Sequence, residues 1–292
     1  MQPDPEFLTV KELAALLRLK ERKIYDLASS GAVPCSRATG KLLFPSAEIR
    51  AWIARESAGG TQGTDKVRPP ILLGSHDPLL DWAIRESRSG LATFFDGSGD
   101  GLERFLDGGG VAAGLHLFDP ARAAWNIPAV QRAATGRNVA LIGFAKRVRG
   151  LVLGGHSANV GGMADLKGQR IVPRQPGSGA RSLFDHLAAR EGLTPEDFQM
   201  TAMARTETEA VQAVARGDAD VALGLETMAR DFSLSFVPLM EERYDLLIDR
   251  RSWFEPQMQH MFAFLRSAAF QSKARGMGGY DVSELGAVRW NG

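Results

Sequence analysis

The sequence predicts an α/β protein with a small N-terminal module and a larger C-terminal module. Two observations lead to this prediction. The segment 57–70, SAGGTQGTDKVRPP, has almost no apolar residues and ends in Pro-Pro, which is typical of a linker. After it, short apolar runs alternate with helical patterns, which indicates a mostly parallel sheet covered by helices. We therefore expect one module at 1–56 and another at 71–292, joined by this linker.

Composition excludes several classes of protein. The 292 residues are 44% hydrophobic and 24% charged, as in ordinary soluble globular proteins. A net charge of +1 means that any nucleic-acid surface must be a local patch. The single cysteine excludes an internal disulfide and a cysteine-rich zinc site. Without an 18-residue apolar run or a signal-peptide pattern, we expect a soluble cytoplasmic protein that does not interact with membranes.

The small module is expected to be helical. Thr9-Val10-Lys11-Glu12 matches the capping-box pattern and opens a helix over 11–17. A second helix follows over 20–30, and Gly31 ends it. The segment 32–44 is expected to be an extended wing, after which Ser46 caps a third helix. Helix, tight turn, helix, two-stranded wing and helix is the plan of a winged helix-turn-helix.

The large module is expected to alternate strands and helices. Strands are predicted at 71–74, 91–95, 111–117, 139–144, 151–153, 170–173, 200–204, 221–225, 235–237 and 244–248. Helices are predicted at 77–88, 100–107, 120–134, 179–191, 206–216, 226–231 and 255–268. This order implies a parallel sheet with helices on its faces.

Three junctions in the large module share one pattern, in which an apolar strand runs into Gly and Ser and then into a helix. They end at Ser75, Ser98 and Ser178. A helix start leaves backbone N–H groups unpaired, and glycines let a ligand approach them. Because ligands bind where strand ends meet helix starts in open α/β sheets, the repetition predicts an anion site. Each serine taken alone is more often a simple helix cap.

Residues 7–55 resemble the excisionase and MerR-type DNA-binding module. The matching features are LTVKELA at 8–14, Tyr25, GAVP at 31–34, a basic wing ending in Phe44, and AEIRAW at 47–52. Basic residues fall where a recognition helix and a wing would meet the major groove and the phosphates, although such a charge run is often only a solvated face. The candidate DNA-binding residues are Arg18, Lys20, Arg22, Lys23, Tyr25, Arg37 and Lys41.

Residues 70–284 resemble the type 2 periplasmic-binding-protein-like domain of cytoplasmic regulators. The matching motifs are GSHD at 74–77, GS at 97–98, GLHL at 114–117, WNIP at 125–128, DLKGQRI at 165–171, RQPGSGAR at 174–181, GDADV at 217–221 and GGYD at 278–281. Ala180 replaces the usual Thr, and Gly155-His156-Ser157 replaces the usual Gly-Asn-Pro. The resemblance implies two lobes that close on a small ligand, the second at about 150–243. It also implies a ligand of molybdenum or tungsten metabolism.

Together, the junctions and the resemblance define the predicted ligand site. Its residues are Ser75, His76, Ser98, Gly99, His116, Trp125, Asn126, Gln175, Ser178, Gly179, Arg181 and Glu226. Alternatives remain open for several of them. Arg181 contacts the anion or forms a salt bridge, and His116 contacts the ligand or belongs to the core or hinge. Trp125 and Asn126 line the cleft or pack, and Glu226 binds a ligand donor or holds the lobes together.

Patterns for catalysis do not occur in the sequence. Gly40-Lys41 lacks the rest of a P-loop, and 97–101 misses the dinucleotide-binding spacing. There is no G-x-S-x-G nucleophile elbow, and the histidines lack metal-ligand spacing. We therefore expect neither an enzyme nor a protein-held metal or cofactor.

The sequence thus predicts a one-component transcription regulator that binds operator DNA as a homodimer or higher oligomer and a small anionic effector in its cleft. Molybdate or tungstate is the favoured effector. The molybdenum cofactor or its pterin precursor is second, because Trp125 and Phe95 could stack on a pterin. The alternative from another class is a non-regulatory delivery protein that uses its N-terminal module for protein contacts.

Overall fold

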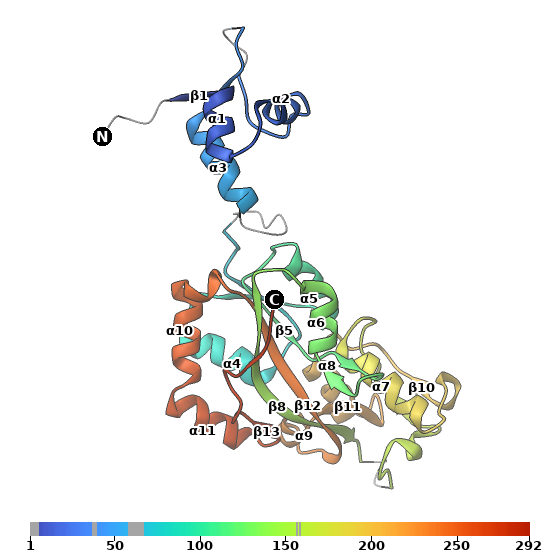
Figure 1. The fold of residues 1–292 in the computed structure, drawn as a ribbon. Helices are drawn as coiled ribbons and strands as arrows, with labels where there is room; N and C mark the ends of the chain where they lie inside the picture. Colours follow the sequence, from blue (N-terminus) through green and yellow to red (C-terminus); the bar gives the residue numbers. More distant parts are fainter. Residues whose placement is uncertain (1–5, 37–39, 58–66, 156, 158) are drawn as a thin grey trace. The chain divides into compact units, whose positions relative to one another are not determined.

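The computed structural model describes residues 6–36, 40–57, 67–155, 157 and 159–292. The chain divides into two compact units, Met1–Gly63 and Thr64–Gly292. Figure 1 shows the fold of both, and each unit is described by itself. Most of the predicted linker, at 58–66, and Arg37 of the predicted wing lie outside the described residues.

The N-terminal unit is a small helical module. Its elements are β1 (Phe7–Thr9), α1 (Val10–Leu17), α2 (Glu21–Ser29), β2 (Leu43–Pro45) and α3 (Ser46–Ser57). Thr9 and Glu12 form the predicted capping box, and Arg18 ends α1 in the left-handed conformation. One core joins all three helices and β2, with Leu13, Ile24, Phe44 and Ile49 fully buried.

Strand pairing in this unit differs from the prediction. The sequence did not reveal β1, which pairs antiparallel with β2. Within the expected wing, a bridge joins Ser36 to Leu43. Leu43 therefore pairs with Thr9 of β1 as well as with Ser36, and it ties the wing to the start of α1.

The C-terminal unit is built on one ten-stranded sheet. Its main path runs β10-β9-β11-β8-β12-β5-β3-β4. These strands are β3 (Ile71–Gly74), β4 (Ala92–Phe95), β5 (Ala112–Leu115), β8 (Val139–Leu153), β9 (Arg170–Ile171), β10 (Gln199–Met200), β11 (Val221–Leu225) and β12 (Ser235–Asp249). Two further strands, β13 (Tyr280–Asp281) and β14 (Val288–Asn291), pair with β8. A separate hairpin is formed by β6 (Phe118–Asp119) and β7 (Ala124–Trp125).

Helices cover both faces of this sheet. They are α4 (Pro78–Ser87), α5 (Ser98–Leu106), α6 (Ile127–Ala134), α7 (Gly179–Arg190), α8 (Glu207–Ala215), α9 (Glu226–Asp231), α10 (Pro256–Leu265) and α11 (Ala268–Met277). Short 3-10 helices occur at Met163–Leu166 (η1), Pro195–Asp197 (η2) and Ser252–Phe254 (η3). Alternate residues of one strand face opposite layers: Leu72 of β3 packs in the cluster of α4, α10 and α11, and Leu73 in the cluster of α5 and α6.

The two long strands β8 and β12 connect two lobes. They pair antiparallel along their whole lengths, as Figure 1 shows in green and orange. On one side of them, β3, β4 and β5 run parallel to one another, and this part is the first lobe. On the other side, β9, β10 and β11 are parallel, and these strands with α7, α8 and α9 form the second lobe. Both lobes therefore share one sheet.

Several predicted elements were wrong in extent. The predicted strands 139–144 and 151–153 are one strand, β8, and 235–237 and 244–248 are likewise one strand, β12. The predicted helix 120–134 begins only at Ile127, because β6 and β7 occupy the segment before it. The predicted helix 255–268 ends at Leu265, and Ser267 caps a further helix, α11.

Candidate functional site

Three strand ends of the first lobe meet at His116. Its Nε2 atom lies 2.8 Å from the hydroxyl oxygen of Ser75, which follows β3. Its backbone N–H donates to the hydroxyl oxygen of Ser98, which begins α5 after β4, at 3.0 Å. All three residues are buried. The structure therefore brings together Ser75, Ser98 and His116 at the carboxyl edge of the parallel strands, as expected for an α/β binding site.

The glycine-rich loop of the second lobe lies against this cluster. A Cβ atom added at Gly179 would lie 2.5 Å from the His116 carbonyl oxygen, so only glycine fits this approach. A Cβ atom at Gly97 would lie 3.7 Å from the Cα atom of Ser178, and one at Gly99 would lie 3.0 Å from the Gly177 carbonyl oxygen. The loops that precede α5 and α7 thus pack backbone against backbone, with the two lobes closed on each other.

Helix starts supply the free donors at this contact. Ser178 caps α7 by accepting from the Arg181 N–H at 3.2 Å. Asp77, and not Ser75, caps α4 by accepting from the Leu80 N–H at 2.7 Å. No side chain among the described residues caps α5, which starts after Gly97. The first N–H groups of α5 are therefore the donors that an anion would meet.

The His116 ring is held neutral. Burial lowers its pKa, and the nearby charges of Arg147 and Arg149 act in the same direction. Glu242, whose carboxylate oxygen lies 3.3 Å from Nδ1, opposes this shift without reversing it. A neutral ring that accepts from the Ser75 hydroxyl at Nε2 carries its proton on Nδ1, which faces the Glu242 carboxylate. His116 thus links Ser75 in the first lobe to Glu242 on β12.

A network of buried charges continues from Glu242 into the second lobe. Arg149 donates to Glu242 through Nε at 2.7 Å and to Glu207 through Nη2 at 3.1 Å. Arg174 Nη1 lies 3.1 Å from the same Glu207 oxygen. Arg147 donates to Glu242 and, at 2.7 Å, to Asp77. The three arginines Arg147, Arg149 and Arg174 match the three carboxylates Asp77, Glu207 and Glu242, so the network is electrically balanced.

These charges also fix the protonation states. Burial alone would raise the pKa values of Glu207 and Glu242. The charges of the neighbouring arginines outweigh burial, bringing the pKa of Glu207 to about 2 and that of Glu242 well below its usual value. Both carboxylates are therefore ionised at neutral pH. They join the long strands to the first turn of α8, across the point where the two lobes meet.

Local sequence patterns do not predict this network. The predicted strands stopped at residue 144 and resumed at 151, because Lys146, Arg147 and Arg149 interrupt the apolar pattern of β8. The signal was the spacing of Arg147 and Arg149, which places both side chains on one face of a strand. Glu242 lies opposite Arg147 in the register of β8 and β12, and this pairing cannot be recognised without the register.

Other predicted ligand residues have structural partners. Asn126 has a positive backbone φ. Its side chain accepts from the Leu117 N–H at 2.7 Å and donates to Asp245 at 2.7 Å. Trp125 packs on Phe118, with ring centroids 4.9 Å apart, and contacts the core of the second lobe. Glu226 pairs with Arg230 at 3.1 Å and lies close to Gly279, where an added Cβ atom would be 2.9 Å from the Glu226 Cβ atom. These contacts favour the packing alternatives for Trp125 and Asn126 and, for Glu226, a place beside the C-terminal segment.

The remaining residues lie nearer the loops. His76 packs edge-on against Phe95, with ring centroids 5.8 Å apart. Gln175 donates to the Asp96 carbonyl oxygen at 3.4 Å and so connects the two lobes. Its Oε1 atom is buried and has no hydrogen-bond partner among the described residues.

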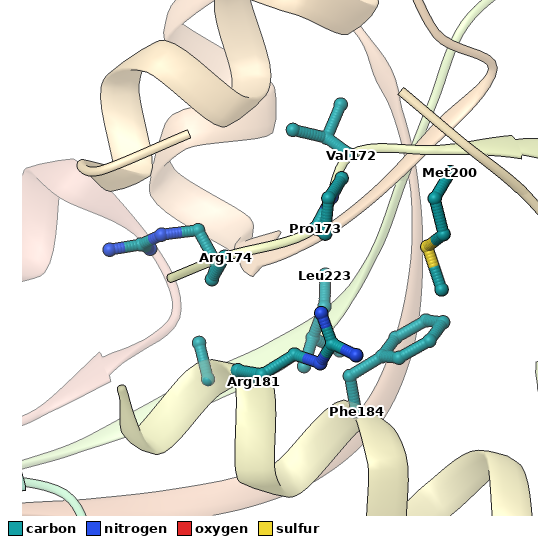
Figure 2. A pocket seen from close by; sticks show the side chains of 8 residues that line it. Val172, Pro173, Arg174, Arg181, Phe184, Met200 and Leu223 are labelled. Carbon is teal, nitrogen blue, oxygen red and sulfur yellow. The ribbon is translucent and has the colours of Figure 1, made fainter. Parts of the chain in front are cut away.

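The two arginines beside the glycine-rich loop diverge. Arg181 pairs with Asp185 at 2.9 Å and lines a small crevice together with Phe184 and Met200. Figure 2 shows its guanidinium beside the Phe184 ring, while Arg174 points away from that ring. Arg174, which begins the same RQPGSGAR motif, is the one that enters the buried network. The salt-bridge alternative for Arg181 therefore has a defined partner, Asp185.

The candidate DNA-binding residues of the described part lie on the surface of the N-terminal unit. Lys20 precedes α2, Arg22, Lys23 and Tyr25 lie on it, and all are exposed, as are Arg18 and Lys41. Ile24 and Ala28 form the buried side of the same helix. The basic face of α2 is therefore available to a ligand, as a recognition helix requires.

Comparisons with known proteins agree with this architecture. Residues 82–266 match the family model described as PBP superfamily domain, and residues 7–57 match the model described as helix-turn-helix domain. The chain is 26% identical over 299 residues to the uncharacterized protein YvgK of Bacillus subtilis (strain 168), covering 96% of each chain. It is 35% identical over 99 residues to an uncharacterized protein in a ferredoxin 2Fe-2S gene 5′ region of Clostridium pasteurianum, covering 34% of this chain and 81% of the relative.

A solved structure shows the same fold at low identity. It is a putative phosphate ABC transporter substrate-binding protein with bound phosphate from Clostridium perfringens, with a TM-score of 0.51 and 12% identity, covering 74% of this chain and 98% of that chain.

None of the helices in the described residues has the length and apolar character needed to cross a membrane. The chain belongs to the family described as PBP superfamily domain, and it carries a helix-turn-helix domain at its N-terminus.

Proposed function

We propose that this protein is a one-component, ligand-responsive transcription regulator. Its helix-turn-helix domain binds operator DNA, and its C-terminal domain binds a small anionic effector between the lobes. The observation that carries the proposal is the convergence of the Ser75, Ser98 and Ser178 junctions on His116, in a chain that begins with a helix-turn-helix domain. A binding domain joined to such a module is an architecture typical of regulators.

An oxyanion fits the donors at this contact. The uncapped start of α5 presents backbone N–H groups, and Ser98, its first residue, and Ser178 lie beside it, whereas the Ser75 hydroxyl donates to His116. Molybdate or tungstate remains our favoured effector, in keeping with the resemblance. The pterin alternative needs free aromatic faces, whereas Trp125 packs on Phe118 and Phe95 packs against His76. These contacts favour the compact anion.

A ligand must separate the loops that now touch. Even a single added Cβ atom at Gly97 would already be in contact with Ser178, so an anion at this point and the present loop contact compete for the same space. An effector that binds only one arrangement of the lobes shifts the population towards that arrangement. This differential binding is what coupling to DNA affinity requires.

Isothermal titration calorimetry of the full chain with molybdate, tungstate, sulfate and phosphate tests the effector class. We expect micromolar or tighter binding of molybdate or tungstate, lost in Ser98→Ala and Ser178→Ala. Lys167→Ala, which changes a largely exposed side chain away from these loops, is the control and should bind as the unchanged protein does. If none of the four anions binds, the oxyanion is not the effector, and the molybdenum cofactor or its pterin precursor becomes the favoured one.

A further inference from the structure

The buried arginines of the second lobe have donor capacity that the protein itself does not use. Arg149 and Arg174 are at most 8% exposed. The Nη1 atom of Arg149 has no hydrogen-bond partner among the described residues, and Arg174 Nη1 lies 3.1 Å from a Glu207 oxygen without the alignment of a hydrogen bond. A buried charged donor without a partner is costly, and such groups require an explanation. Both guanidinium groups lie around one oxygen of Glu207, at 3.1 Å each.

Glu207 is the least firmly held carboxylate of the network. Glu242 accepts from Arg147 and, through both carboxylate oxygens, from Arg149. Asp77 accepts from the Leu80 N–H, from Arg147 and from the Tyr280 hydroxyl. Glu207 accepts one hydrogen bond, from Arg149 at 3.1 Å, and pairs with Arg174 at 3.1 Å through the same oxygen. Its Oε2 atom has no hydrogen-bond partner among the described residues.

The position of this group suits a ligand site. Arg174 follows β9, and Glu207 opens α8 after β10, so both lie at the carboxyl edge of the second lobe's parallel strands. The contacts His116–Glu242, Glu242–Arg149 and Arg149–Glu207 connect this edge with the serine cluster. A ligand placed between the lobes would therefore meet both edges.

We propose that Arg149 and Arg174 form an anion-binding pair that Glu207 closes in the absence of effector. An oxyanion takes the place of the Glu207 carboxylate and receives the unused Nη1 donor of Arg149 and the Nη1 donor of Arg174 that now faces Glu207. Because the network is balanced, an incoming anion adds least net negative charge when an internal carboxylate leaves, and Glu207 has the fewest bonds to lose. This inference rests on the proposed anionic effector and names the group with which it competes.

Calorimetry of the full chain with molybdate, tungstate, sulfate and phosphate tests the competition. Glu207→Gln removes the internal anion, and we expect at least tenfold tighter anion binding than in the unchanged protein. Glu209→Gln changes an exposed carboxylate on the same helix and should leave the affinity unchanged. A general loss of structure cannot mimic the expected result, because it would weaken binding.

Arg174→Lys provides a second test that does not depend on the folding of Glu207→Gln. It keeps the charge but removes the planar fork, and we expect at least tenfold weaker binding. Tighter binding by Glu207→Gln than by the unchanged protein supports the inference. Binding by the unchanged protein that neither variant alters overturns the inference and leaves the proposed effector class standing. If neither the unchanged protein nor folded Glu207→Gln binds any of the four anions, both the inference and the proposed effector class are overturned.

Discussion

The imidazole of His116 lies 2.8 Å from the hydroxyl of Ser75 on one side and 3.3 Å from the carboxylate of Glu242 on the other. This single ring therefore joins the serine cluster of the first lobe to the charge network that enters the second. Its neutrality matters, because a charged ring would lie beside Arg147 and Arg149. The link between these two groups is the basis of the first prediction.

Stability should fall on mild acidification because of His116. Its pKa is lowered in the folded protein from an ordinary 6.5, so the unfolded chain takes up the proton first. The contribution of the neutral ring is fully present above about pH 6.5 and is progressively lost as pH falls below it. Denaturant unfolding from pH 8 to pH 5 should show this loss, and His116→Gln should reduce it. An equal pH dependence in both proteins would contradict the neutral, buried ring.

Gly179→Ala should separate the lobes or destabilise the protein. The new Cβ atom would lie 2.5 Å from the His116 carbonyl oxygen, and overpacking of this kind costs about 1–3 kcal/mol. Gly276→Ala is a control in α11, where a Cβ atom meets nothing within 4 Å; a gain of about 0.5–1 kcal/mol is expected there. Urea unfolding measures the stability of both variants. A Gly179→Ala variant as stable as the unchanged protein would mean that the start of α7 does not pack against His116.

Glu242→Gln should strongly destabilise the C-terminal domain. It leaves Arg147 and Arg149 buried without their shared carboxylate, and breaking a buried pair costs about 3–5 kcal/mol. The adjacent Glu241→Gln affects an exposed carboxylate 3.7 Å from Lys146 and should cost less than about 1 kcal/mol. Thermal and urea unfolding of both variants measure the difference. Equal stability of Glu242→Gln and Glu241→Gln would contradict the role given to the network.

Arg22→Ala combined with Lys23→Ala should weaken DNA binding and flatten its dependence on salt. For every phosphate that the protein no longer neutralises, the slope of log K against log salt becomes shallower by about 0.9. Arg190→Ala with Lys167→Ala removes two exposed positive charges from the other domain and should leave DNA affinity unchanged. Fluorescence anisotropy at several salt concentrations measures this. Equal DNA binding by both double variants would favour the delivery protein.

Much of the fold follows from local patterns in the sequence. The Thr9–Glu12 capping box, the strand at 71–74 and the helix opened by Ser178 lie where local signals place them, because caps and apolar runs act over a few residues. The convergence of the serine junctions also followed from a general property of parallel strands. The Arg147–Glu242 network did not, because it depends on the register between two strands almost a hundred residues apart.

The roles of individual site residues were harder to predict for the same reason. Asn126 has a left-handed backbone, and its partners Arg243 and Asp245 are distant in sequence. Arg174 and Arg181 flank one loop and have similar local surroundings, yet their side chains diverge towards Glu207 and Asp185. The spacing of these residues in the sequence does not indicate the directions in which their side chains point.

The most direct test of the account is DNA affinity measured with and without effector. The full chain would be titrated onto DNA from the region upstream of its own coding sequence, with molybdate, tungstate, sulfate or phosphate at saturating concentration. We predict that the anion bound in calorimetry changes the DNA dissociation constant by about fivefold or more, and that Ser98→Ala abolishes the change. An unchanged dissociation constant in the presence of an anion that the chain demonstrably binds would contradict the account.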